Sequence, residues 1–143
     1  MTLAIDTDVL VNWAMSGASR HRAARQLIET ESDRPGGIGL IPQVLFEFVH
    51  IVTDRRRFER PLTMEEALRL VRELWDAPEV VRIIAGTTVL HRTVELLTLL
   101  RLGRKRILDT ALAATLEEAG VSRLATFNRR DFEAFSFLEV VSP

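Results

Sequence analysis

The sequence contains no cysteine, and its apolar stretches are short. Without cysteine the chain has no disulfide, no thiolate zinc site and no cysteine nucleophile. No apolar run approaches the roughly 20 residues that a membrane-spanning helix needs. The first residues lack the basic stretch of a secretory signal peptide and are interrupted early by Asp6. We therefore expect a cytoplasmic protein that makes no contact with a membrane.

The chain also lacks an excess of either charge, since 19 Lys and Arg residues stand against 20 Asp and Glu residues. No global field attracts nucleic acid, so any such binding must depend on local clusters of positive charge. Lys105 is the only lysine, and the other basic residues are arginines. Arginine suits bidentate contacts with phosphate, although a base-composition bias in the gene would produce the same excess.

The length of 143 residues is that of one domain, and we expect a single domain over residues 1–143. Hydrophobic residues make up 47% of the chain and charged residues 27%, which excludes a chain that is disordered throughout. The mean hydropathy of +0.09 is slightly apolar for so small a domain. A buried interface between subunits would explain that value.

Short apolar segments alternate with segments of helical pattern along the whole chain. We expect strands at 2–5, 38–41, 80–85, 124–127 and 138–141, and helices at 9–14, 18–30, 42–57, 63–76, 88–102 and 107–119. Thr63 and Glu66 form a capping box, and Leu68, Val71, Leu74 and Trp75 are expected on the buried face of that helix. This order predicts an α/β fold, a three-layer α/β/α sandwich around a mostly parallel sheet of four or five strands.

Acidic and amide residues stand where the strands of this sheet are expected to end. Asp6 follows the first strand, Asn128 follows the fourth, and Asp131 comes three residues later. Asp109 begins the helix that leads into the fourth strand, and Glu47 interrupts an otherwise apolar helix. Chemistry collects at the carboxyl ends of parallel strands, so we expect these residues to meet at one edge of the sheet.

Each acid also has an ordinary structural explanation. Asp6 would cap a helix, Glu47 would be a solvated side chain, and Asp109 would interact favourably with the positive end of the helix dipole in the first turn. Together, however, carboxylates at such short range repel one another and do not all ionise unaided. A divalent cation resolves that repulsion. Hard oxygen ligands without a cysteine or histidine cluster favour Mg²⁺ or Mn²⁺, and such an ion can activate water for attack on phosphorus.

Four segments of the chain resemble, in the same order, the motifs of PIN-domain ribonucleases, most closely the VapC-type toxins of prokaryotic toxin–antitoxin pairs. These segments are Ile5–Leu10, Gln43–Phe48, Leu108–Thr115 and Ala125–Phe132. The resemblance covers essentially the whole chain. It implies a single PIN domain that acts as a metal-dependent endoribonuclease, forms a homodimer and is blocked by a small cognate antitoxin protein.

Carried over by position, the resemblance makes Asp6, Glu47 and Asp109 ligands of Mg²⁺ or Mn²⁺. Asn128 and Asp131 would complete the catalytic set by positioning water or ribose. Many family members have aspartate where this chain has the neutral Asn128, so Asp131 is the better candidate for the fourth negative charge. A neutral fourth ligand favours one bound metal ion over two. The expected reaction is attack of a metal-activated water on the phosphodiester, without a covalent nucleophile.

Further residues of the motifs are expected to support the site. Thr7, Asp8 and Thr126 would orient water or the metal-binding carboxylates. The predicted RNA contacts, which stand beside the third and fourth motifs, are Arg104, Lys105, Arg129 and Arg130. Solvated loops or helix ends explain each basic cluster equally well when it is taken alone.

Three other interpretations remain open at this point. Asp6-Thr7-Asp8 after a strand also resembles the start of a haloacid dehalogenase-type phosphohydrolase, with Asp6 as nucleophile, but that family needs a distal lysine and a late acidic pair. A receiver-like module needs an aspartate at the end of the third strand, where this chain has Ile84-Ala85-Gly86. A degenerate PIN domain that only binds RNA or antitoxin is the third, because of Asn128.

Overall fold

Five short strands form one sheet, and every neighbouring pair in it runs parallel. The strands are β1 (Leu3–Ile5), β2 (Ile38–Leu40), β3 (Val80–Arg82), β4 (Arg123–Ala125) and β5 (Glu139–Val141), in the spatial order β3-β2-β1-β4-β5. This computed structural model describes all residues from 1 to 143. The predicted parallel sheet is confirmed, with five strands.

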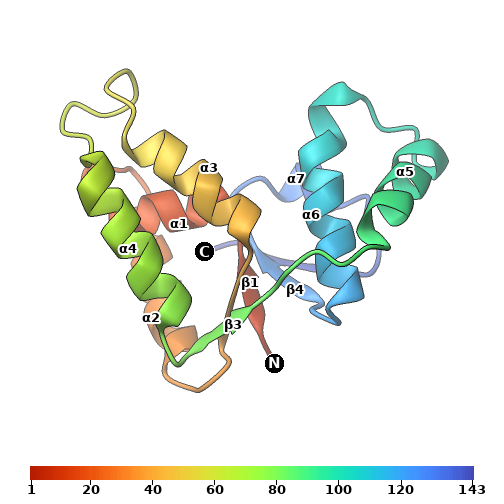
Figure 1. Ribbon diagram of the computed structural model, residues 1–143, viewed down its shortest axis with the longest axis horizontal. Helices are drawn as coiled ribbons and strands as arrows, with labels where there is room; N and C mark the ends of the chain where they lie inside the picture. The colour runs from red at the N-terminus through yellow and green to blue at the C-terminus, as the bar shows by residue number, and fades with distance from the viewer.

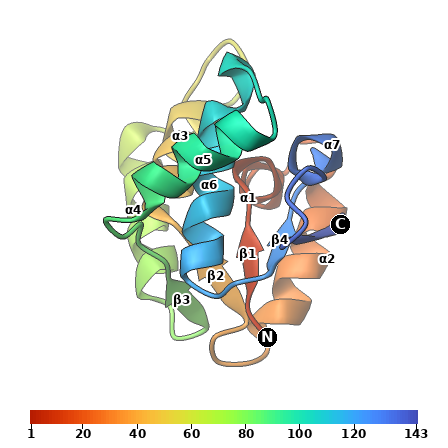
Figure 2. The same cartoon turned by 90° about the vertical axis from the view of Figure 1, so that its right-hand side faces the viewer.

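Helices cover both faces of the sheet, as the three-layer prediction requires (Figures 1 and 2). They are α1 (Thr7–Ala14), α2 (His21–Ser32), α3 (Pro42–Val52), α4 (Met64–Asp76), α5 (Val89–Leu99), the 3₁₀ turn η1 (Arg104–Arg106), α6 (Ile107–Glu118) and α7 (Arg129–Phe132). Helices α1 to α4 pack on one face, and α5 and α6 on the other. The face changes because the chain passes from β3 back across β1 to β4. No helix here has the length and apolar character needed to cross a bilayer.

The helix starts follow local sequence signals. The Asp6 Oδ1 accepts a hydrogen bond from the backbone N–H of Thr7 at 2.8 Å and caps α1. The predicted capping box of α4 is present, since the Thr63 hydroxyl accepts from the Glu66 N–H and the Glu66 carboxylate accepts from the Thr63 N–H. Pro42 occupies the first turn of α3, where a missing N–H costs nothing.

Several predicted boundaries were wrong. Helix α3 ends at Val52 rather than near residue 57, because the Asp54 carboxylate accepts the N–H of Arg56 and turns the chain. Strand β3 ends at Arg82 rather than at residue 85. In α4 the predicted core residue Leu68 is 49% exposed, and Ala67 is buried in its place. The other predicted residues, Val71, Leu74 and Trp75, are partly buried against the core, so the predicted phase of this helix is right and only Leu68 was misplaced.

The core forms around β1 and β2, whose residues are all buried. On one side it contains Val9 and Phe48 from α1 and α3, and on the other Leu112 and Leu116 from α6. Burial on both faces is typical of a parallel sheet and explains why these strands read as short continuous apolar runs. The same burial holds the carboxyl ends of β1 and β4 rigidly side by side.

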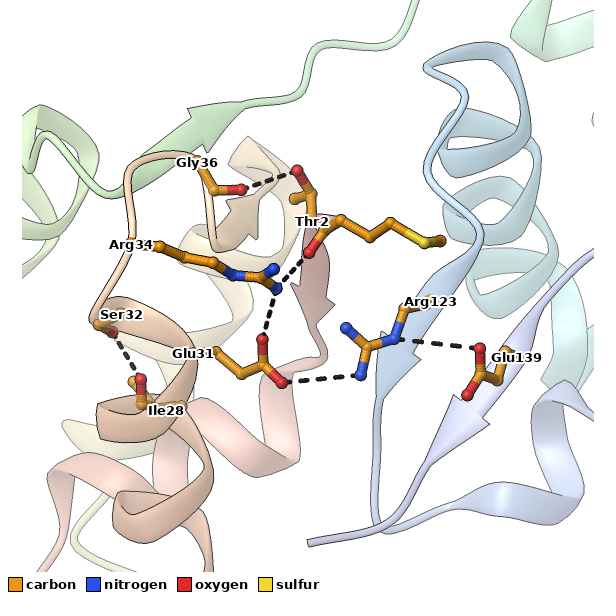
Figure 3. A network of polar contacts seen from close by, with 9 residues as sticks. Thr2, Ile28, Glu31, Ser32, Arg34, Gly36, Arg123 and Glu139 are labelled. Atoms are coloured by element: carbon orange, nitrogen blue, oxygen red, sulfur yellow. Dashed lines mark hydrogen bonds and ion pairs between the residues drawn. The ribbon is translucent and has the colours of Figure 1, made fainter.

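A network of ion pairs ties together the opposite edge, where the strands begin (Figure 3). The Glu31 carboxylate, at the end of α2, lies 2.8 Å from Nη2 of Arg34 and 3.6 Å from Nη2 of Arg123. Arg123 also lies 3.9 Å from the Glu139 carboxylate, and Arg34 donates to the carbonyl of Met1. Ion pairs thereby join the starts of β4 and β5 to the end of α2, and the Arg34 hydrogen bond joins the start of β1 to it.

Candidate active site

The candidate site lies at the carboxyl ends of β1 and β4, where the helices that follow the strands lie on opposite faces of the sheet. Such a switch point leaves a crevice in which α/β proteins commonly bind ligands. Asp6 follows β1 directly, and Thr126 follows β4. Glu47, Asp109 and Asp131 reach the same place from α3, α6 and α7.

Asp6 is the most firmly held of the acidic residues, with only 8% of its surface exposed. Its Oδ1 accepts from the Thr7 N–H and its Oδ2 accepts from the Thr126 hydroxyl, both at 2.8 Å. Burial raises the pKa of Asp6, these two hydrogen bonds oppose the rise, and the charges of Glu47 and Asp131 add to it. Each carboxylate oxygen retains a further lone pair that can accept a ligand.

The Thr126 hydroxyl does more than hold Asp6. Thr126 is fully buried, and its Oγ1 accepts the backbone N–H of Asn128 at 3.0 Å while donating to Asp6. The loop that leads into α7 is thus tied to the end of β1. The predicted supporting position of Thr126 agrees with this geometry.

Glu47 is half-buried on α3 and is fixed through both oxygens. Its Oε2 accepts from the Thr7 hydroxyl at 2.9 Å, and its Oε1 accepts from the side-chain amide of Gln43 at 3.2 Å. The same amide donates to the Leu108 carbonyl at 3.4 Å and so links α3 to the start of α6. Gln43 was not predicted as a site residue, although its position one helical turn before Glu47 is a usable signal.

Asp109 lies half-buried in the first turn of α6. Burial, followed by the charges of Asp6 and Asp131, raises its pKa to about 6, although the nearby Arg106 guanidinium opposes the rise. Glu47 contributes a smaller effect in the same upward direction. The four carboxylates therefore act on one another electrostatically across the switch point, as the sequence predicted.

Asp8 sits beside this group but is turned toward the end of β4. Its Oδ2 accepts the backbone N–H of Phe127 at 3.1 Å, while its Oδ1 is buried without any hydrogen-bond partner. Burial and the charge of Asp6 raise the pKa of Asp8 to about 7, against the N–H groups of Phe127 and Val9 and the charge of Arg20. An orphaned carboxylate oxygen at this depth marks a place where positive charge is lacking.

Asn128 and Asp131 differ in their relation to the acids. Asn128 is exposed, and its side chain does not cap α7. The Asp131 carboxylate acts on both Asp6 and Asp109. The geometry thus favours Asp131 as the fourth acidic member.

The predicted basic residues lie outside the acidic group. Arg104, Lys105 and Arg130 are exposed. The guanidinium of Arg129 donates to the Val140 carbonyl at 3.2 Å and therefore packs against β5. None of these four side chains contacts a site carboxylate.

Two arginines that were not predicted lie closer. Arg106 donates to the backbone carbonyl of Asp131, and its Nε is buried without a partner. Its spacing of three residues before Asp109 was an available signal. The Arg20 guanidinium lies 4.6 Å from the centre of the Phe127 ring. No local sequence pattern points to that contact, because the two residues are far apart in the chain.

The donor set fits a hard divalent cation. The oxygen donors come from four carboxylates. Arg106 is the one cation whose charge acts on Asp109, which is one of these four. No three acidic or histidine side chains yet stand close enough to form a closed metal cage. Mg²⁺ is commonly held by only one or two carboxylates together with waters and substrate phosphates, so an open group of this kind suits it.

Comparison with known proteins agrees with this architecture. A family model described as "PIN domain" matches residues 3–138. Ribonuclease VapC43 of Mycobacterium tuberculosis is 32% identical over 84 residues, which cover 59% of this chain and 57% of that protein. Ribonuclease VapC24 of the same organism is 27% identical over 146 residues, covering 99% of this chain and 96% of that protein.

Solved structures show the same fold at low sequence identity. The sarcin-ricin loop cleaving toxin VapC20 of M. tuberculosis has a TM-score of 0.70 at 19% identity and covers 99% of this chain and 100% of its own. VapBC2 of Rickettsia felis, bound to a promoter DNA fragment, has a TM-score of 0.70 at 15% identity and covers 100% and 99%. A toxin–antitoxin complex of Klebsiella pneumoniae has a TM-score of 0.66 at 19% identity and covers 99% and 96%. The predicted PIN-like sandwich is confirmed.

Proposed function

Because this chain belongs to the PIN-domain family, we propose that it is a metal-dependent endoribonuclease and the toxin of a toxin–antitoxin pair. The observation that carries the proposal is the convergence of four carboxylates from β1, α3, α6 and α7 on the switch point of the sheet, with little compensating charge. The ribonuclease names of the matched relatives support RNA as the substrate. VapC nucleases of this family are generally dependent on a divalent metal, and the oxygen donors favour Mg²⁺ or Mn²⁺ here.

Asp6, Glu47 and Asp109 are the residues that would hold the ion, and Asp131 would add the fourth negative charge. A bound divalent cation supplies a lowered pKa for water and offsets negative charge on the phosphate. Thr126 and the Thr7 N–H keep Asp6 in one orientation, so that no rearrangement of that carboxylate is needed during the reaction.

The proton of the attacking water needs an acceptor close to neutral pH. Glu47 is the candidate for that role, as ligand or base, because its carboxylate is held by Thr7 and Gln43. Asn128 and Asp131 would position water or ribose from the α7 side.

The alternatives receive less support from the geometry. A haloacid dehalogenase-type mechanism needs a lysine in the site, whereas Lys105, the only lysine of the chain, is exposed and contacts no site carboxylate. A degenerate domain that only binds RNA or antitoxin would not need to retain four mutually repelling acids. Their retention costs stability and favours an active site.

We further propose a homodimer and a small antitoxin as protein partners. The outer side of α5 and the start of α6 expose large apolar side chains, namely Leu90, Val94, Leu99, Ile107 and Leu108. Large exposed apolar side chains gathered on two helices that pack on each other are typical of a protein interface. It also accounts for the slightly apolar composition of the chain.

The test is cleavage of structured RNAs by the antitoxin-free protein in Mg²⁺ or Mn²⁺ and in EDTA. We expect cuts that require the metal and disappear in the double variant Asp6→Asn, Asp109→Asn. The matched control is Glu73→Gln, which removes an exposed carboxylate of α4 and should cut normally. Cleavage that persists in EDTA or in the double variant would contradict the proposal.

A further inference from the structure

Arg20 presents a cation with unused hydrogen-bond donors at the edge of the acidic site. It stands immediately before α2 and is exposed, and its backbone N–H donates to the Asn12 side chain at 3.2 Å. Its guanidinium lies over the Phe127 ring at 4.6 Å and makes no hydrogen bond or ion pair within the chain. All five of its N–H groups are therefore available to a ligand.

The Phe127 ring that carries this guanidinium is itself fixed to the site. The backbone N–H of Phe127 donates to Oδ2 of Asp8, and the preceding residue, Thr126, donates to Asp6. The charges of Asp6 and Arg20 both act on the Asp8 carboxylate. Arg20 and Asp6 are thus both near enough to Asp8 for their charges to act on it.

An arginine stacked on an aromatic ring differs from a freely moving surface arginine. Contact with the ring holds the planar group and lowers the entropy that it loses on binding. Its edges remain open to the bidentate contact that phosphate oxygens favour. Arg129, by contrast, uses its guanidinium on the Val140 carbonyl and is less available for that role.

We propose that Arg20, supported by the Phe127 ring, binds an RNA phosphate adjacent to the scissile one and so positions the strand across the carboxylates. The inference rests on the proposed ribonuclease function and adds a binding residue that lies outside all four sequence motifs. It also explains how an acidic crevice accepts a polyanion: one fixed positive charge at its edge receives the neighbouring phosphate.

Binding can be measured without cleavage in the Asp109→Asn variant, which we expect to be inactive. The probe is a single-stranded RNA of 20 nucleotides with mixed sequence and a 3′-fluorescein label, and its fluorescence anisotropy is recorded in Mg²⁺. We expect Arg20→Gln to weaken Kd about tenfold, as for loss of a charge-assisted hydrogen-bond pair. The slope of log K against log salt should fall by about 0.7, as for one lost contact on a single strand. Arg20→Lys keeps the positive charge but loses the bidentate geometry of the guanidinium, so its Kd should lie between those of the parent and Arg20→Gln.

Arg22 provides the matched control, because it is an exposed arginine of the same helix start and lines a surface hollow formed by α2 residues alone. Arg22→Gln should bind within twofold of the parent. Phe127→Leu should weaken binding about threefold, and in combination with Arg20→Gln it should add almost nothing, because both changes remove one supported contact. Additive losses would overturn the supporting role of the ring.

Kinetics in the active background separate binding from a purely structural role. Arg20→Gln should raise KM about tenfold and leave kcat and Tm nearly unchanged. If it instead lowers kcat or Tm while Kd stays within twofold of the parent, Arg20 only screens Asp8 and the inference fails.

If the parent itself neither binds nor cuts RNA, the proposed function fails together with the inference. If Arg20→Gln and Arg22→Gln weaken binding equally, the effect is general charge and the inference is overturned.

Discussion

The two edges of the sheet use the same residue types in opposite ways. Where the strands begin, Glu31 is shared by Arg34 and Arg123, so carboxylate and guanidinium charges are paired (Figure 3). Where β1 and β4 end, four carboxylates gather beside Asp8, and the positive charges that act on this group are Arg106 on Asp109 and Arg20 on Asp8. The charges at the first edge are paired with one another, whereas the second edge carries an excess of negative charge.

We take that difference to separate a structural cluster from the proposed functional one. Charges that are paired within the chain need no ligand to neutralise them, and these pairs hold the starts of the strands in place. Unpaired like charges at the other edge cost folding free energy, which a protein retains only where the charges are used. The orphaned Oδ1 of Asp8 lies at the deficient edge.

The largest expected effect is on catalysis and compares one glutamate from each edge. Glu47→Gln should lower kcat/KM for RNA cleavage by at least about a hundredfold, because it removes a charge from the proposed metal-binding group. Glu31→Gln, at the other edge, should stay within about twofold of the parent. Equal losses in both variants would mean that the acidic edge has no special role.

Stability should respond in the reverse order. In EDTA, Asp109→Asn should raise Tm by a few degrees, because it relieves repulsion by Asp6 and Asp131. Glu31→Gln should lower Tm by a few degrees, because it leaves the partly buried Arg123 and the exposed Arg34 without their shared partner. Differential scanning fluorimetry of both variants measures the signs, and a fall of Tm in Asp109→Asn would contradict the repulsion.

The pH dependence of stability sharpens the comparison further. The pKa values of Asp109 and Asp8 are about 6 and about 7 in the folded protein, above the value of about 4 for an unfolded aspartate. Between about pH 4 and pH 7 the folded state therefore binds more protons than the unfolded state, and the free energy of unfolding falls as pH rises. In EDTA we expect a higher Tm at pH 5.5 than at pH 8, with a smaller difference in Asp109→Asn.

The lowered pKa of Glu66 acts below this pH range and does not disturb the comparison. A divalent cation should reverse the trend, because it binds the ionised carboxylates and releases their protons. A Tm in EDTA that rises from pH 5.5 to pH 8 would show that the acids are not destabilising.

A smaller effect is expected from the hydroxyl that orients Asp6. Thr126→Val removes the donor to Asp6 and the acceptor of the Asn128 N–H while it conserves volume. We expect kcat/KM to fall about tenfold, as for loss of a supporting hydrogen bond beside a metal ligand. Thr126→Ser keeps the hydroxyl and should retain most activity, and a serine variant as impaired as the valine variant would argue against the hydrogen bond.

Much of this site could be predicted because its signals are local. The order of strands and helices follows from apolar periodicity and from caps such as Asp6 and Thr63. An acid at a strand end or inside an apolar helix stripe, as at Glu47, is visible in the sequence alone. Parallel strands then bring such residues to one edge without further information.

The remaining features depend on phase and on long-range contact. Whether Arg104, Lys105 or Arg106 turns toward Asp109 is decided by the 3₁₀ turn before α6, which periodicity does not reveal. The contact between Arg20 and Phe127 forms only when α2 packs beside the end of β4. The short helix α7, which carries Asp131, is too brief to leave a periodic pattern.

The most direct test of the difference between the two edges is titration of Mn²⁺ into the metal-free protein, followed by electron paramagnetic resonance of the unbound ion. We predict one Mn²⁺ bound per chain and displaced by Mg²⁺. Asp6→Asn with Asp109→Asn should abolish binding, and Glu31→Gln should leave it unchanged. Undetectable Mn²⁺ binding by the parent, or binding that survives in the double variant, would contradict the assignment of the acidic edge as a metal-dependent active site.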